Sequence, residues 1–147
     1  MVHISNHQNA LLQMYAHQAL RRHINDALQA YDLNPRQWAI LGILQENQAG
    51  VRAATLATEL NVKNPLITML VDPLTKRGWI TKAADTEDGR AKLLQLSAEG
   101  QKHIKKVDAD VAARLDQLLS GVRRSEFDIY QKVMQIILYN ADQLQDL

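Results

Sequence analysis

The chain has 147 residues, of which 46% are hydrophobic and 22% charged, and its formal net charge is +1. This size and composition predict one globular domain with an ordinary core, and the absence of cysteine excludes disulfides, thiolate metal sites and cysteine nucleophiles. No apolar run reaches the roughly 18 residues that span a bilayer, and the first residues lack a signal-peptide pattern, so we expect a cytoplasmic protein with no membrane partner. The charge is uneven, because residues 52–106 hold ten basic and six acidic side chains.

The first expected element is a long amphipathic helix. Residues 11–31 place apolar side chains three and four positions apart, and we expect this helix to start near Ser5. The segment NPRQWAILGIL then predicts a second helix, with Asn34 as N-cap, Pro35 at the first helical position and Gln37 completing a capping box. We expect that helix to run to about residue 47, and VRAATLATEL to form a third, short helix.

The segment NPLITMLVDPLTKRGWI, residues 64–80, predicts a fourth helix that contains two prolines. Asn64 is the expected N-cap and Pro65 the expected first helical residue. At about 100° per residue, one face collects five apolar side chains: Leu66, Ile67, Leu70, Val71 and Leu74. Because Leu74 keeps this phase, we expect Pro73 to bend the helix, at a cost of about 3 kcal/mol, without ending it.

Two short apolar runs follow, separated by the turn-prone sequence ADTEDGR. Trp79 and Ile80 begin the first run, residues 93–96 form the second, and together they predict a β-hairpin with a charged tip. Ser97 is the expected cap of the next helix. A helix, a turn, a second helix and then a hairpin make a winged helix, so we expect a mainly α fold with a small β-hairpin wing.

The run from residue 50 to 100 resembles the MarR family of bacterial winged helix-turn-helix transcription regulators. The resemblance lies in LATELNVKNPLITMLVDPLTKRGWI and in DTEDGRAKLLQLSAEG, and most of all in the D-x-x-D-x-R of Asp85, Asp88 and Arg90. It implies a homodimeric, sequence-specific DNA-binding regulator that acts as a repressor on a palindromic operator. The whole of 1–147 would be one MarR-type domain, with dimerisation helices in 5–31 and 97–146 and a DNA-binding lobe in 34–96.

The residues expected to contact double-stranded DNA fall into three groups. In the recognition helix they are Lys63, Asn64, Pro65, Thr68 and Met69, and in the wing Asp88, Arg90 and Lys92. Contacts to the DNA backbone are expected from Arg36, Arg52 and Lys76. In this interpretation Arg90 enters the minor groove while Asp88 holds its guanidinium. The alternative is a solvated turn with a weak local ion pair.

Two positions depart from the family pattern. Met69 stands where a basic or polar residue is common, and Pro73 replaces what is often arginine or lysine, so two potential phosphate contacts are missing. The alternative function is therefore a winged-helix module that binds a protein or a ligand and has lost DNA binding.

The C-terminal segment FDIYQKVMQIILYNADQLQDL has a wider apolar arc than one face of a surface helix requires. A two-fold dimer would bury it and would set two recognition helices about 34 Å apart. The resemblance further implies a small, often aromatic and anionic effector in a cleft. Our candidates for binding it are Tyr15, His23 and Trp38, although a histidine placed like His23 is more often a core residue.

The sequence contains no motif that indicates catalysis, such as a phosphate-binding glycine loop, a Gly-x-Ser-x-Gly elbow or a His-Glu-x-x-His. His3 and His7 lie four residues apart, but close to the N-terminus, where helices fray. We therefore expect neither an enzyme nor a cofactor or metal site.

Overall fold

A computed structural model describes residues 7–145 and divides the chain into two compact units, 1–115 and 116–147. The boundary between the units falls within helix α5 (Ala98–Leu118). His3, the expected helix start near Ser5 and the expected helix end at residue 146 lie outside the described residues.

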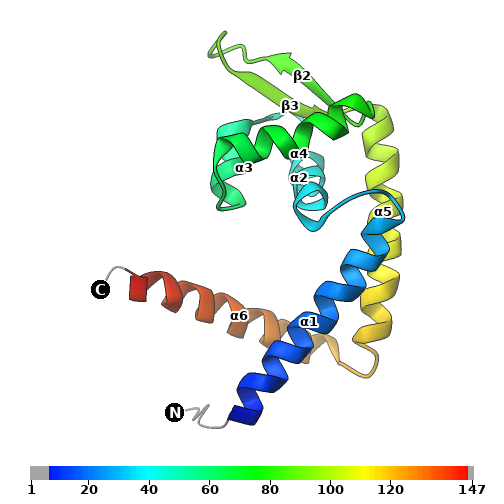
Figure 1. Ribbon diagram of the computed structural model, residues 1–147, viewed down its shortest axis with the longest axis vertical. Helices are drawn as coiled ribbons and strands as arrows, with labels where there is room; N and C mark the ends of the chain where they lie inside the picture. The colour runs from blue at the N-terminus through cyan, green and yellow to red at the C-terminus, as the bar shows by residue number, and fades with distance from the viewer. Residues whose placement is uncertain (1–6, 146–147) are drawn as a thin grey trace. The chain divides into compact units, whose positions relative to one another are not determined.

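The first unit is mainly helical and carries one small sheet (Figure 1). Its elements before α5 are α1 (His7–Gln29), α2 (Pro35–Glu46), β1 (Val51–Arg52), α3 (Ala53–Glu59), α4 (Asn64–Lys76), β2 (Ile80–Ala84) and β3 (Lys92–Leu96). The three strands are antiparallel in the order β1-β3-β2, and β2 and β3 form the expected hairpin. This is the winged helix-turn-helix fold that the order of elements predicted.

The capping box at the start of α2 is confirmed. The amide of Gln37 donates to Asn34 Oδ1 at 2.9 Å, and the amide of Asn34 donates to Gln37 Oε1 at 3.1 Å. Gln37 is buried, and its Nε2 also donates to the carbonyl oxygen of Leu70 at 3.2 Å. The Gln37 side chain therefore caps the start of α2 and also attaches that helix to α4.

Two predicted boundaries are wrong. Val51 and Arg52 do not begin the third helix but form β1, because Val51 is buried and pairs with Leu94 on β3. The N-cap of α4 is Lys63, which has extended backbone angles and no side-chain cap hydrogen bond, and not Asn64, which is the first helical residue. Pro65 is therefore the second helical residue and not, as expected, the first.

Helix α4 continues through its second proline. Four apolar side chains, Ile67, Leu70, Val71 and Leu74, are buried on one face, and Leu74, which follows Pro73, is fully buried. Arg77 closes the helix with an amide that donates to the Pro73 carbonyl at 3.0 Å. The preserved phase therefore keeps the helix intact, as predicted, and the bend at Pro73 stays a prediction.

The base of the wing is attached to the core through Trp79, which is buried. Its ring stacks on His103 of α5 at 4.3 Å between centroids, and the Arg77 guanidinium lies 3.8 Å from the ring centroid. Ser97 caps α5 as expected, since its Oγ accepts from the amide of Gly100 at 2.9 Å. These contacts hold the recognition helix, the wing and α5 in one packed body.

The second unit contains α6 (Arg124–Gln145). Its apolar residues follow a helical period, but the large ones remain exposed in the single chain: Ile129, Tyr130, Val133, Ile136, Ile137, Leu138, Tyr139 and Leu144. No helix among the described residues is long and apolar enough to cross a membrane.

Candidate nucleic-acid interface

The exposed start of α4 presents the residues expected in the recognition helix. Lys63, Asn64, Pro65, Thr68 and Met69 are all exposed, whereas the opposite face of the helix packs into the core. Because Lys63 occupies the N-cap position, the Asn64 side chain is not used as a cap, and it makes no hydrogen bond within residues 7–145. Its amide is therefore available to an external partner, beside the positive end of the helix dipole.

A groove of about 390 Å³ runs between α4 and the sheet. Three cationic side chains line it, Arg52 from β1, Lys82 from β2 and Lys92 from β3, together with Thr68 from α4. In this arrangement, basic residues separated by up to 40 positions in the sequence meet at one groove, where Arg52 is paired with Asp85 and Lys82 with Asp72. Lysine and arginine side chains are the groups that hold phosphates in protein–DNA complexes.

Lys82 was not among the expected site residues. Its Nζ lies 3.4 Å from Asp72 Oδ1, and both side chains are partly exposed, so the pair joins β2 to α4. The alternation of side chains along a strand could have predicted its position. Lys82 is two residues beyond the buried Ile80 and therefore lies on the same side of the strand.

The loop of the wing is anchored, at the point where it leaves β2, by an ion pair that the sequence did not reveal. Arg52 Nε donates to Asp85 Oδ2 at 2.6 Å, and its Nη2 also contacts that oxygen. Asp85 is buried, and its other oxygen accepts from the amide of Glu87 at 2.9 Å. The Glu87 amide, followed by the Arg52 guanidinium, lowers the pKa of Asp85. Arg52 therefore positions the wing from inside, besides lining the groove.

At the tip of the wing, the expected role of Asp88 needs correction. Asp88 Oδ1 accepts from the backbone amide of Arg90 at 3.0 Å, and not from its guanidinium, because the tight turn aims the amide back at the carboxylate. The guanidinium of Arg90 is exposed and has no hydrogen bond or ion pair in the part of the chain that the structure describes. Asp88 thus shapes the turn, and the Arg90 charge projects outward.

The remaining expected backbone contacts lie apart from the groove. Arg36 is exposed in the first turn of α2, and Lys76 is exposed in the last turn of α4. Neither lines the groove, which brings together only Arg52, Thr68 and Lys92 of the expected residues.

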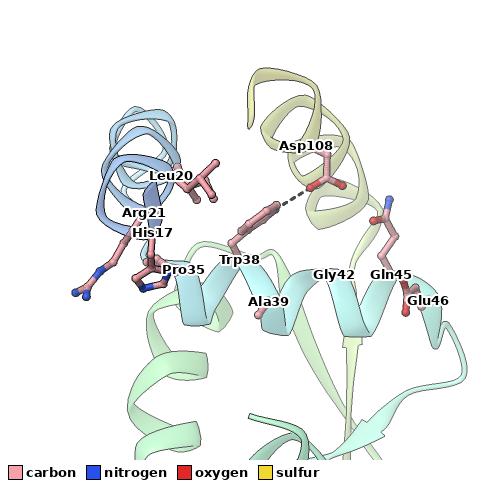
Figure 2. A pocket seen from close by; sticks show the side chains of 11 residues that line it. His17, Leu20, Arg21, Pro35, Trp38, Ala39, Gly42, Gln45, Glu46 and Asp108 are labelled. Atoms are coloured by element: carbon pink, nitrogen blue, oxygen red, sulfur yellow. Dashed lines mark hydrogen bonds between the residues drawn. The ribbon is translucent and has the colours of Figure 1, made fainter. Parts of the chain in front are cut away.

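A separate pocket of about 640 Å³ lies among α1, α2 and α5 of the first unit (Figure 2). Trp38 forms one wall, and its Nε1 donates to Asp108 Oδ1 at 2.8 Å. His17 and Arg21 of α1 line it as well. Of the three residues expected at a ligand, only Trp38 lines this pocket; Tyr15 is exposed, and His23 is partly buried elsewhere on α1.

The described residues contain no cluster of three or more His, Asp or Glu side chains that could hold a metal ion. The arrangement offers groups that can bind a partner: a groove lined by arginine and lysine side chains, an exposed helix terminus, the exposed Arg90 guanidinium and an apolar pocket with a few polar groups.

Comparison with known proteins gives one consistent result. Residues 33–92 match the model of the MarR family. The transcriptional repressor MprA of Escherichia coli (strain K12) is 28% identical over 136 residues, which cover 91% of this chain and 77% of MprA. The regulator MhqR of Bacillus subtilis (strain 168) is 22% identical over 128 residues, which cover 87% of this chain and 88% of MhqR.

Two solved structures share the fold. CouR from Rhodococcus jostii RHA1, solved with bound p-coumaroyl-CoA, has a TM-score of 0.78 at 24% identity, covering 87% of this chain and 90% of CouR. A variant of MarR from Escherichia coli, solved in complex with operator DNA, has a TM-score of 0.75 at 19% identity, covering 88% of this chain and 92% of that one.

Proposed function

We propose that the chain, whose residues 33–92 match the model of the MarR family, is a sequence-specific DNA-binding transcription regulator that represses as a homodimer. The observation that carries the proposal is the cationic groove between α4 and the sheet, lined by Arg52, Lys82 and Lys92. It lies beside the exposed start of α4, so phosphates in the groove would place α4 against base edges. The DNA complex of the structurally similar MarR variant supports this mode of binding.

A second copy of the chain is the partner that the exposed apolar residues favour. Large apolar side chains on α6, such as Ile129, Leu138 and Tyr139, are 63–67% exposed, and Leu12 on α1 is 67% exposed. Large apolar side chains that a single chain leaves exposed in this number favour burial in an interface. We propose that helices within 5–31 and 97–146 make a two-fold dimer that presents the lobes of residues 34–96 to a palindromic operator.

The alternative function is a winged helix that docks a protein or a ligand and no longer binds DNA. One observation favours it: α4 carries no cationic side chain between Lys63, at its N-cap, and Lys76, in its last turn. The positive charge that a DNA contact needs must therefore come from the sheet and the wing.

A salt titration separates the two functions. If lysine and arginine side chains of both protomers contact several phosphates, log affinity for random duplex should fall steeply against log salt concentration. A protein-docking module would show a slope near zero. Selection of bound duplexes from a random pool then gives the specific site, and a motif without two-fold symmetry would contradict the dimeric arrangement.

We further propose that a small aromatic anion in the pocket weakens DNA binding. The pocket offers the aromatic wall of Trp38 and, on α1, the positive charge of Arg21. The helix that carries Trp38 also holds α4 through the bond from Gln37 to the Leu70 carbonyl, so a shift of α2 would reach the recognition helix. CouR, which shares the fold, was solved with bound p-coumaroyl-CoA, and this supports the proposal that a protein of this fold binds a small ligand.

Arg21→Ala tests the ligand site with a matched control. Titration with 4-hydroxybenzoate, followed by tryptophan fluorescence, should show binding that Arg21→Ala weakens by about tenfold, because a charge-assisted hydrogen bond is lost. Arg22→Ala removes the neighbouring charge, which is exposed but does not line the pocket, and should leave the affinity unchanged. Equal effects of the two variants would place the ligand elsewhere.

A further inference from the structure

The exposed face of α4 consists of two parallel rows of side chains. A polar row contains Asn64, Thr68, Asp72 and Lys76, and an apolar row contains Pro65, Met69 and Pro73. Residues four positions apart are neighbours on a helix surface, so each row is continuous. The apolar row extends over nine residues, whose eight steps rise about 12 Å along the helix.

Met69 is the prominent side chain of the apolar row. It is 71% exposed, whereas Ile67, Leu70, Val71 and Leu74 of the same helix are buried. The core therefore does not use it. Single exposed apolar side chains are common on protein surfaces. Met69 differs from these by its position, because it lies in the second turn of α4, whose start is proposed to contact DNA. It also lies between two prolines that extend the same apolar row.

Before Lys76, in the last turn, the polar row has no side chain that recognises guanine. Arginine and lysine read guanine through its O6 and N7 atoms, but neither type occurs in α4 before Lys76. Asp72 is occupied by its ion pair with Lys82. An apolar strip in the major groove has one matching group on the base edges, which is the 5-methyl group of thymine.

We infer that Met69 is a specificity-determining residue that contacts the 5-methyl group of a thymine in each half of the operator. The inference rests on the proposed DNA binding and adds the base that α4 selects. In this arrangement Met69 supplies a base contact, and affinity comes from the groove and the wing. The long, unbranched side chain of methionine suits this role because it adapts to the methyl surface.

The test removes one methyl group from the DNA. Each thymine of the selected operator is replaced in turn by deoxyuridine, which differs only by the 5-methyl group. For the wild-type protein we expect one position per half-site where the replacement weakens binding, by about fourfold in one half-site and about fifteenfold in both. Thymines that α4 does not contact serve as internal controls.

Two variants assign the effect to Met69. Met69→Gln keeps the length of the side chain but removes its apolar end, and it should bind thymine and uracil operators equally. Met69→Leu keeps an apolar end and should retain the discrimination. Because Met69 is exposed, both variants should have the same melting temperature as the wild type. Thermal unfolding followed by circular dichroism measures it.

The outcomes distinguish this inference from the proposed function. If the random pool yields no bound duplex, DNA binding itself is wrong. If duplexes are selected but every thymine tolerates uracil, or if Met69→Gln discriminates as strongly as the wild type, DNA binding stands and the assignment to Met69 is overturned.

Discussion

Arg90→Ala is expected to weaken operator binding by roughly tenfold or more. The Arg90 guanidinium is exposed at the tip of the wing and has no partner within residues 7–145, so its charge is available to the negative potential of a narrow minor groove. The substitution should leave the turn intact, because Asp88 accepts from the backbone amide of residue 90, which alanine retains. Fluorescence anisotropy with the selected operator measures the loss.

Arg114→Ala is the matched control for this effect. Arg114 is also exposed and lies on α5, fourteen residues beyond Gly100 in the first turn and so about 21 Å along the helix. The control removes the same charge from the chain but not from the wing, and operator affinity should stay near that of the wild type. An Arg90→Ala protein that binds as tightly as the wild type would reject the minor-groove contact.

Gly100→Ala is expected to destabilise the protein by about 3 kcal/mol, although alanine is the better helix former. A Cβ at this position would lie 2.1 Å from the carbonyl oxygen of Trp79. That carbonyl cannot easily move, because it accepts from the amide of Ser97 at 3.0 Å and its residue is packed between Arg77 and His103. Relief of the clash must separate α5 from the base of the wing.

Gly42→Ala makes the same chemical change in α2 with the opposite expected sign. Nothing lies within 4 Å of a Cβ at Gly42, so the variant should gain about 1 kcal/mol from helix propensity. Chemical denaturation of the two variants beside the wild type measures both changes. Gly100→Ala with wild-type stability would mean that α5 does not pack this tightly on Trp79.

The sequence predicted the elements whose hydrogen bonds are local. The capping box joins Asn34 and Gln37, three residues apart, and the phase of α4 depends only on the spacing of its apolar residues. The hairpin followed from two apolar runs around a turn-prone segment, and Ser97 caps α5 as expected. A pattern that is satisfied within one or two helical turns needs no knowledge of the rest of the chain.

Contacts between segments that are distant in the sequence were not predicted. Arg52 and Asp85 are 33 residues apart, and their ion pair exists because β1 pairs with β3. Strand β1 has only two residues and is too short to show any period in the sequence. Lys63 rather than Asn64 caps α4, since the packing of the buried face sets where the helix begins. Of the residues expected at DNA, only the tertiary structure showed which share the groove.

The amino-acid sequence by itself determined the order of the helices, the wing and the face that α4 buries, because these follow from side-chain spacing and short-range hydrogen bonds. Only the tertiary structure decided that Lys82 lies across the groove from Thr68, that Asp88 supports the backbone of Arg90, and that Gly100 cannot carry a side chain. The physical reason is that these groups meet through packing between elements, and close packing leaves each of them only the place that its neighbours allow.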